Sequence, residues 1–561
     1  MSWDEFNQHP HTICGVIEKW AEERPNKFAF IIYDTEKEVT YKEFKEAITA
    51  MAFKLYNMGF RKGDILATSL PFLYEHIILG YACAKLGVLW TPMDLRLKPP
   101  EIMKNLNLLK TKCKMYCHLG KTSVANFGMI GAAVKKNTPW LEYVVQFSTP
   151  DDRYRTGILP AYQIAEEAKN EIIDAMKNPE SMKGFFEECA KVGEDDPIII
   201  IFTTGSTGWP KPAMLTNKGI TCQNMCLSKG LQAEEVDIML VNLPPSHVGG
   251  TTEQFMTPIF KGGTCVVLHV FDPAKTLDAI QKYKVTIMGQ IPALFVMEWR
   301  LPDYDKYDLS SLKYSIAAGQ PVDRPFLEKL STMAPNFFTG LGLTETSGFC
   351  SYTPPGLSFE EFINTLGYDF EIYPITIRNP MNDDGTAGDE LPNGEIGEIC
   401  YNGPQTFLGY FGNEDVTSKT LSSDGYLYTG DMGYVDEKGL HLSGRRKFLL
   451  KPKGFQVFPP EVEAFIAELS QVEFIGIIGA KHEVFTEGIV VYIKVREGEV
   501  LTEKEVYDHC KGMAAYKRPS LVVFLDEFPL NRVAKTDYVV LKERVDRDIE
   551  EARAKGGWDT V

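Results

Sequence analysis

The sequence lacks an apolar run long enough to cross a bilayer; the run Ile77–Ala84, for example, is interrupted by Lys85. Its first residues, Met1–Glu5, are acidic and have no apolar core, so we expect no signal peptide. Positive charge is also scarce, because 76 Asp and Glu against 59 Lys and Arg give a net charge of −17. Nucleic acids and anionic membranes bind clustered basic residues, so neither is an expected partner.

A cysteine framework is missing too. The eleven cysteines are scattered, and the pairs Cys113/Cys117 and Cys222/Cys226 have the spacing of a helical face without a nearby His to complete a zinc set. We expect small apolar residues or surface thiols in a reducing cytoplasm. Hydrophobic residues at 44% and charged residues at 24% exclude a disordered or fibrous chain, and 561 residues predict two or more packed units.

The N-terminal part alternates between helix and strand patterns. Thr40–Glu43 has the form of a capping box, and a helix of apolar spacing follows it until Gly59. Residues 65–70 form a short apolar strand, a helix is expected over 75–86, and 88–91 is the next strand. This rhythm predicts an α/β protein with mainly parallel sheets.

Two further features extend the pattern. Asp272 and Pro273 predict the start of a helix, and Val285–Met288 the strand after it. Near Gly444 a small basic stretch follows a run of turn residues. We therefore expect a large domain over 1–445 and a small domain over 446–561, a segment of about 115 residues.

The most distinctive segment begins with the apolar strand 198–202 and continues with glycines, hydroxyl residues and a Lys. Glycines let successive backbone N–H groups curve around an anion, and hydroxyls and a Lys add donors and charge. Lys211 stands between two prolines, so the segment is no Walker loop. The alternative is a solvated loop without function.

The segment Thr203–Lys211 resembles the signature loop of the adenylate-forming superfamily, which comprises acyl- and aryl-CoA synthetases, nonribosomal adenylation domains and beetle luciferases. The resemblance runs in the family's order over almost the whole chain. It implies a large N-terminal domain of several subdomains with mainly parallel sheets, and a small mobile α+β C-terminal domain. The phosphate-binding residues it implies are Thr203, Thr204, Gly205, Ser206, Thr207, Gly208 and Lys211.

The segment 341–346 resembles the family's aromatic-Gly-x-Thr-Glu motif. The resemblance implies that Thr344 contacts the α-phosphate and that Glu345 holds Mg²⁺, which prefers oxygen ligands. The family usually has Tyr at the position of Leu341, so here apolar contact replaces ring stacking on adenine. Taken alone, a Thr-Glu pair is more often an ordinary helix N-terminus.

Other parts of the resemblance assign the ribose, the acyl pocket and the adenine loop. Asp431 and, fourteen residues later, Arg445 resemble the ribose-binding pair. Gly319 and Gln320 with Leu341 and Gly342 complete the nucleotide site. The acyl-pocket residues it implies are His247, Val248, Gly249, Ala317 and Ala318.

The C-terminal part matches as well. Lys447 falls at the family's hinge residue, and Lys451 and Gly454 fall on the stretch that faces the thiol tunnel after the small domain rotates. Lys535 falls at the adenylation lysine, preceded by Ala534 where the family usually has Gly. Taken alone, each of these lysines would be a solvated surface residue.

The resemblance implies an AMP-forming acid–thiol ligase that uses ATP, Mg²⁺ and coenzyme A. The aromatic content and the glycines after His247 suggest a medium-sized apolar acid, which an aromatic, alicyclic or medium-chain acid would be. One alternative is an adenylation enzyme that loads a carrier protein or releases acyl-AMP. Amino-acid-activating modules usually carry an Asp in the pocket wall, and His247 followed by two glycines shows no such anion. The other is a nucleotide-binding regulator without catalysis. A homodimer stays open, and no integral membrane association is expected.

Overall fold

The structure is a computed structural model that describes residues 2–122, 125–204, 210–445, 449–450, 452, 457–482, 486–530 and 536–558. The chain forms two compact units. The first comprises Met1–Ile375, Asp383–Thr386 and Tyr401–Leu427, and the second comprises Thr376–Asn382, Ala387–Cys400 and Tyr428–Val561. The second unit thus begins before Arg445, and the functional division at that residue stays a prediction.

An eight-stranded sheet in the first unit has the order β19-β9-β8-β4-β3-β5-β6-β7. Its strands pair in parallel from β8 to β7, whereas β9 pairs antiparallel with both β8 and β19. The strands are β3 (Ile65–Ser69), β4 (Leu89–Pro92), β5 (Cys113–Leu119), β6 (Tyr143–Phe147), β7 (Leu159–Pro160), β8 (Pro197–Thr204), β9 (Pro210–Thr216) and β19 (Gly409–Tyr410).

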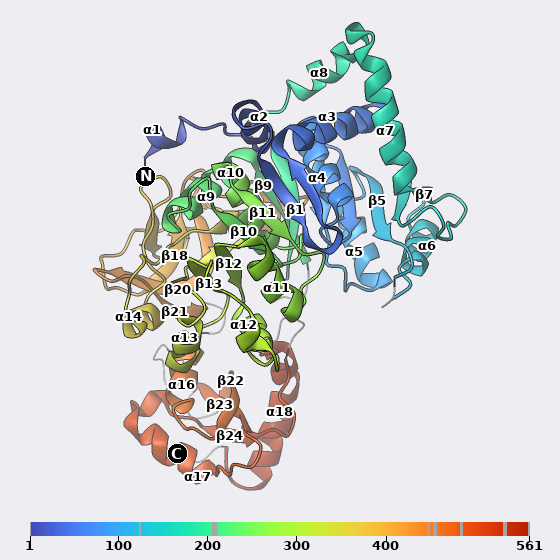
Figure 1. The fold of residues 1–561 in the computed structure, drawn as a ribbon. Helices are drawn as coiled ribbons and strands as arrows, with labels where there is room; N and C mark the ends of the chain where they lie inside the picture. Colours follow the sequence, from blue (N-terminus) through green and yellow to red (C-terminus); the bar gives the residue numbers. More distant parts are fainter. Residues whose placement is uncertain are drawn as a thin grey trace. The chain divides into compact units, whose positions relative to one another are not determined.

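Helices along this half of the chain pack on the sheet and on one another, with α3 against both α4 and α7 (Figure 1). The predicted capping box is confirmed, because Thr40 and Glu43 satisfy each other's backbone N–H at the start of α3. Gly59 follows the end of α3 with φ of +90°. The helices are α1 (Trp3–Phe6), α2 (Ile13–Glu23), α3 (Tyr41–Asn57), α4 (Tyr74–Leu86), α5 (Pro99–Leu109), α6 (Gly128–Asn137), α7 (Ala161–Met176), α8 (Lys183–Cys189) and α9 (Asn217–Gly230).

A seven-stranded sheet of order β14-β13-β12-β10-β11-β1-β2 forms the second layer of this unit, parallel except for β2. Its strands are β1 (Phe28–Ile32), β2 (Lys37–Thr40), β10 (Ile238–Val241), β11 (Thr264–Val267), β12 (Ile287–Gln290), β13 (Tyr314–Ala317) and β14 (Asn336–Phe338). The accompanying helices are the π-helix η3 (Gly249–Met256), α10 (Thr257–Lys261), α11 (Pro273–Tyr283), α12 (Pro292–Trp299), α13 (Arg324–Leu330) and α14 (Phe359–Asn364). Helix α15 (Glu414–Ser418) packs on β19 of the eight-stranded sheet. The predicted mainly parallel α/β fold is confirmed.

Two local predictions need correction. Cys113 and Cys117 lie buried on strand β5 and not on a helix, whereas Cys222 and Cys226 are buried on α9. Strand β12 begins two residues later than predicted, because the Thr286 hydroxyl accepts the Ile238 N–H in place of a backbone carbonyl.

The second unit is an α+β structure. The four-stranded sheet β17-β18-β20-β21 comes first, and a three-stranded sheet β22-β23-β24 follows with helices on it. The strands are β17 (Ile375–Arg378), β18 (Gly397–Tyr401), β20 (Leu427–Asp436), β21 (Gly439–Arg445), β22 (Val472–His482), β23 (Thr486–Val495) and β24 (Leu521–Phe524). The helices are α16 (Pro459–Ile466), α17 (Glu503–His509) and α18 (Tyr538–Ala554). None of the helices in the described ranges has the length and apolar character that crossing a membrane requires.

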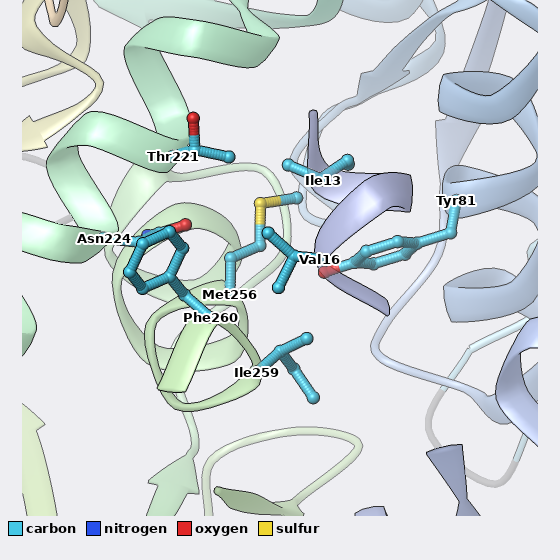
Figure 2. Close-up of a pocket in the computed structure, with 8 residues that line it drawn as sticks. All are labelled: Ile13, Val16, Tyr81, Thr221, Asn224, Met256, Ile259 and Phe260. Carbon is cyan, nitrogen blue, oxygen red and sulfur yellow. The ribbon is translucent and has the colours of Figure 1, made fainter. Parts of the chain in front are cut away.

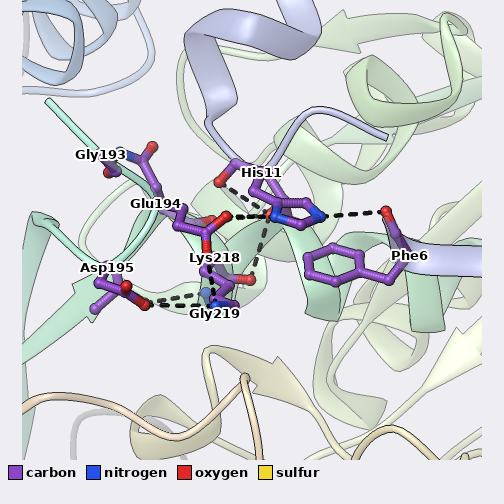
Figure 3. Close-up of polar contacts among 10 residues, drawn as sticks. Phe6, His11, Gly193, Glu194, Asp195, Lys218 and Gly219 are labelled. Atoms are coloured by element: carbon purple, nitrogen blue, oxygen red, sulfur yellow. Dashed lines mark hydrogen bonds and ion pairs between the residues drawn. The ribbon is translucent and has the colours of Figure 1, made fainter. Parts of the chain in front are cut away.

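The N-terminal segment contacts the residues that flank the hairpin formed by β8 and β9 (Figure 3). Glu194, just before β8, forms an ion pair with Lys218, just after β9, at 2.6 Å, and His11 contacts the other oxygen of the same carboxylate. Asn217 adds a hydrogen bond of 3.1 Å to the carbonyl of Gly193. These contacts hold the open end of the hairpin whose connection is the predicted phosphate loop.

Candidate active site

The predicted acyl and nucleotide residues of the first unit follow neighbouring parallel strands. His247–Gly249 come after β10, Ala317–Gln320 after β13, and Leu341–Glu345 after β14. In parallel sheets the carboxyl ends of the strands meet at one edge, which is where α/β proteins bind ligands. Three segments that are far apart in sequence are therefore brought to a single edge of the seven-stranded sheet.

Buried side chains fix the shape of this edge. The Gln254 amide oxygen accepts the backbone N–H groups of Asn242 and Leu243 at 3.1 and 3.0 Å. Ala317 ends β13, and Gly319 has φ of +85°, which favours a residue without Cβ. The loop after β13 can therefore turn sharply and leave room above the sheet.

The Thr344–Glu345 pair lies at the tip of a small hairpin and not at a helix N-terminus. Strands β15 (Gly342–Leu343) and β16 (Gly348–Phe349) pair antiparallel, and a 3₁₀ turn over Thr344–Thr346 joins them. The Thr346 hydroxyl lies 2.7 Å from the Gly348 carbonyl and 3.1 Å from the Leu343 N–H, which closes the turn. Thr344 and Glu345 are half-buried, as ligand-binding side chains at a turn need to be.

Tyr410 contacts both Glu345 and Lys211, the lysine of the predicted phosphate loop. The Tyr410 hydroxyl donates to Oε1 of Glu345 at 2.6 Å, and Lys211 Nζ lies 5.2 Å from the centroid of the Tyr410 ring. Strand β19 brings Tyr410 there by pairing with β9 opposite Ala213. Because Tyr410 is 4% exposed, it fixes the carboxylate from the protein side and leaves the second oxygen of Glu345 for a ligand.

Sequence reasoning missed Tyr410. Burial and the adjacent Glu345 carboxylate raise the pKa of its phenol well above the usual value, so it remains a donor at every physiological pH. The one available signal in the sequence was the dipeptide Gly409-Tyr410. In the structure Gly409 has φ of +123°. A Gly-Tyr pair in a short strand is too common to single out without knowledge of its partner.

The residues at this turn suit Mg²⁺. No group of three or more His, Cys, Asp or Glu side chains able to hold a metal occurs in the described part of the chain. Mg²⁺ does not need such a cage, because it usually binds one or two carboxylates and completes its shell with phosphates and water. A single half-buried carboxylate held by Tyr410 fits that demand.

The predicted acyl-pocket wall carries a carboxyl group that the sequence reasoning did not find. Glu253 lies one turn beyond Gly249 on η3, and a Cβ added at Gly249 would lie 3.6 Å from its Oε2 and 3.1 Å from His247 Nδ1. Burial raises the pKa of Glu253 to about 8, although the backbone N–H of Phe349 lowers it. The predicted wall, whose motif shows no anion, therefore has a carboxyl group beside it; Thr251 and Thr252 separate Glu253 from Gly250, the last residue of the motif.

The predicted ribose pair lies in the second unit. Asp431 on β20 and Arg445 on β21 are register partners, and Arg445 Nε lies 2.7 Å from Asp431 Oδ1. The Asp431 side chain is buried, and its backbone N–H donates to the Thr429 hydroxyl at 3.1 Å. A fixed carboxylate beside a guanidinium is a suitable receptor for two neighbouring hydroxyl groups.

Several predicted residues lie outside the described ranges, and for them the assignments stay predictions. Thr203 and Thr204 end strand β8, and Lys211 follows on β9. The predicted residues outside the described ranges are Gly205, Ser206, Thr207, Gly208, Lys447, Lys451, Gly454 and Lys535.

Figure 2 shows a different cavity, enclosed by α2, α4, α9, η3 and α10. Val16, Tyr81, Met256 and Phe260 are among the residues that line it, and its volume is about 10 Å³. That is room for about one water molecule, so the cavity cannot receive an acid or a nucleotide.

The fold and the site define an enzyme that binds a nucleotide at the edge of parallel sheets. The family model of AMP-binding enzymes matches residues 17–411, and that of the AMP-binding enzyme C-terminal domain matches residues 461–535. The chain therefore belongs to the AMP-binding enzyme family. The predicted class, an AMP-forming acid–thiol ligase that uses ATP, Mg²⁺ and coenzyme A, is confirmed.

Relatives resemble the chain over almost its whole length. 4-coumarate–CoA ligase 3 of Arabidopsis thaliana is 26% identical over 92% of this chain and 88% of its own. Human mitochondrial medium-chain acyl-CoA ligase ACSF2 is 25% identical over 96% of this chain and 88% of its own. The structure of ATP-bound MatB from Rhodopseudomonas palustris is similar in fold, with a TM-score of 0.75 at 22% identity, covering 94% of this chain and 98% of the other.

Proposed function

We propose that the protein activates a carboxylic acid as acyl-AMP at the edge formed after β10, β13 and β14, and transfers the acyl group to coenzyme A. The observation that carries this proposal is the chain of contacts from Lys211 through Tyr410 to Glu345. It brings the predicted phosphate-binding hairpin and the predicted metal carboxylate together beside the predicted acyl wall.

Adenylation must overcome the repulsion between a carboxylate and the anionic oxygens around the α-phosphorus. Mg²⁺, when bound by Glu345, supplies positive charge at the phosphates. The Thr344 hydroxyl donates to the α-phosphate, while Lys211 and Lys535 stabilise the charge that develops toward the leaving pyrophosphate. Tyr410 keeps the Glu345 carboxylate oriented, so less reorganisation is needed during the reaction.

The second half-reaction needs a thiol in place of pyrophosphate. Rotation of the C-terminal segment about Lys447 would withdraw Lys535 and present Lys451 and Gly454 to the incoming thiol. The boundary between the two compact units falls before Lys447, so the proposed pivot at Lys447 rests on the family resemblance and not on the division of the chain.

The acid is proposed to be aromatic, alicyclic or medium-chain. The relatives named above support this range, because one is called a 4-coumarate–CoA ligase and one a medium-chain acyl-CoA ligase. A cytoplasmic location is proposed as well, since the cysteines are free thiols. The homodimer stays a prediction.

The test is release of AMP that depends on both the acid and coenzyme A. Purified protein is given ATP, Mg²⁺ and a panel of acids, and AMP and thioester are quantified with coenzyme A, with a carrier protein, or with neither. Equal amounts of AMP and CoA thioester support the proposal. Thioester formation only on the carrier protein would favour the carrier-loading alternative, and no AMP with any acid would refute acid activation.

A further inference from the structure

Glu253 and Gln223 both approach Gly348 from the side on which another residue would carry its Cβ. A Cβ added at Gly348 would lie 2.8 Å from Glu253 Oε1 and 3.0 Å from Gln223 Cδ. The carboxyl oxygen and the amide carbon are therefore less than about 6 Å apart, close enough for one hydroxyl oxygen to reach both groups. Gly348 has φ of +133°, so its backbone strongly favours glycine.

This corner is built into the active-site edge. The Thr252 hydroxyl lies 2.7 Å from the Ser347 carbonyl and 3.0 Å from the Val248 carbonyl, which ties η3 both to the Thr344–Glu345 turn and to the predicted acyl wall. Ser347 itself has φ of +60°. Glu253 thus stands between the wall that would hold the acyl chain and the turn that would hold the phosphate.

The amide of Gln223 is only half satisfied by the described residues. Gln223 is fully buried, and its Oε1 accepts from Asn224 Nδ2 at 2.9 Å, which fixes the orientation of the amide. Its Nε2 has no hydrogen-bond partner among the described residues. A buried donor without a partner costs about 1–3 kcal/mol, so the arrangement favours a ligand group that accepts a hydrogen bond.

Glu253 can donate a hydrogen bond to the same ligand group that accepts one from Gln223. It keeps part of its surface accessible, although the surrounding protein is dense enough to raise its pKa to about 8. Both observations hold for a half-buried side chain that is protonated at neutral pH. A neutral carboxyl both donates and accepts, so an uncharged partner suits it better than a cation.

We propose that Glu253 and Gln223 form a subsite for a hydroxyl group on the acid, placed away from its carboxylate. The inference rests on the proposed function, because the acid must enter along the His247–Gly249 wall. The hydroxyl accepts from Gln223 Nε2 and donates to Glu253. An ammonium group has no lone pair for Gln223, and a methyl group leaves both side chains unpaired. The substrate class is therefore a hydroxylated carboxylic acid.

The experiment compares matched acids in the AMP-release assay. A length series of straight-chain acids carries a terminal hydroxyl, methyl or ammonium group, and aromatic acids carry a para-hydroxyl, para-methyl or para-aminomethyl group. For the best length, we expect kcat/KM of the hydroxy acid to exceed that of the methyl acid by about a hundredfold, because a site built for a hydroxyl rejects analogues without one. A ratio below about tenfold, or a preference for the ammonium acid, overturns the subsite.

Variants separate the subsite from the reaction itself. Glu253→Leu and Gln223→Leu should each abolish the preference for the hydroxy acid while the methyl acid still supports ATP–pyrophosphate exchange, and Glu253→Gln should retain part of it. Glu463→Gln is the matched control, since Glu463 is also a buried carboxyl, with a pKa raised to about 7, but lies in the second unit and accepts from Tyr538. It should leave the ratio unchanged.

The two proposals fail in different ways. If wild-type protein releases AMP with methyl acids and discriminates weakly, the subsite is refuted and the ligase proposal stands. If no acid of any kind gives AMP in wild type, the activation proposal is refuted and the subsite with it. An unchanged preference for the hydroxy acid in correctly folded Glu253→Leu and Gln223→Leu proteins overturns the assignment to these residues.

Discussion

Replacement of Glu253 by Gln should change how the stability of the first unit depends on pH. The Glu253 carboxyl has an ordinary pKa of 4.5 when the chain is unfolded and a pKa of about 8 when folded. Between these values the folded state binds one more proton than the unfolded state. The free energy of unfolding therefore falls as the pH rises through this window, and the contribution of the neutral carboxyl is complete only below the unfolded pKa.

The magnitude follows from the two pKa values. At 1.36 kcal/mol per unit, the stability contributed by Glu253 decreases by about 4 kcal/mol between pH 5 and pH 8.5. This is an upper bound, because water that reaches the carboxylate after local opening reduces the penalty. For a unit of roughly 400 residues, 4 kcal/mol corresponds to a shift in Tm of about 4–5 °C. Gln has the same shape, can still accept the Phe349 N–H, and carries no proton to lose.

The assay is thermal unfolding of wild type, Glu253→Gln and the exposed control Glu142→Gln from pH 5 to pH 9. The Tm of Glu253→Gln should rise relative to wild type as the pH increases, by several degrees in total, while Glu142→Gln runs parallel to wild type. Parallel curves for wild type and Glu253→Gln, within about 1 °C over the whole range, would refute the neutral buried carboxyl.

Three further outcomes are expected. Tyr410→Phe removes the donor to Glu345 and should lower kcat/KM for adenylation by about tenfold or more while raising the Mg²⁺ concentration that gives half-maximal rate; an unchanged Mg²⁺ dependence speaks against the positioning role. Lys535→Ala should reduce acid-dependent ATP–pyrophosphate exchange by about a hundredfold or more and spare thioester formation from supplied acyl-AMP. An equal loss in both half-reactions contradicts the proposal that the C-terminal segment rotates between them. Gly348→Ala should cost about 1–3 kcal/mol of unfolding free energy and weaken the preference for a hydroxy acid, since the new Cβ meets Glu253; wild-type stability together with wild-type preference would count against the corner as described.

The helices and strands were largely predictable because their signals are local. The Thr40 capping box, the Asp272 cap and the apolar runs of the parallel strands each depend on a few neighbouring residues. Where a prediction failed, a distant residue had intervened. The Thr286 hydroxyl, and not a backbone carbonyl, accepts the Ile238 N–H. The spacing of Cys113 and Cys117 fits a helical face, but both residues lie on strand β5.

The class of enzyme could be predicted without coordinates, because the motifs around Thr203–Lys211, Thr344–Glu345 and Lys535 occur in the order of one superfamily and resemble its motifs. The sequence by itself also determined the parallel α/β fold of the large unit, since strand and helix periodicity are properties of short segments. Neither result requires any knowledge of which residues meet in space.

The contacts that support the predicted site, and the carboxyl group beside the predicted acyl wall, became visible only in the folded chain. Tyr410 reaches Glu345 because β19 pairs with β9, and Glu253 comes near Gln223 because η3 and α9 pack against each other and against β16 at Gly348. A hydrogen bond depends on positions within a few tenths of an ångström, and chain spacing does not encode such positions for residues far apart in sequence. The proposed preference for a hydroxy acid therefore depends on packing, whereas the class of reaction was predictable from the motifs.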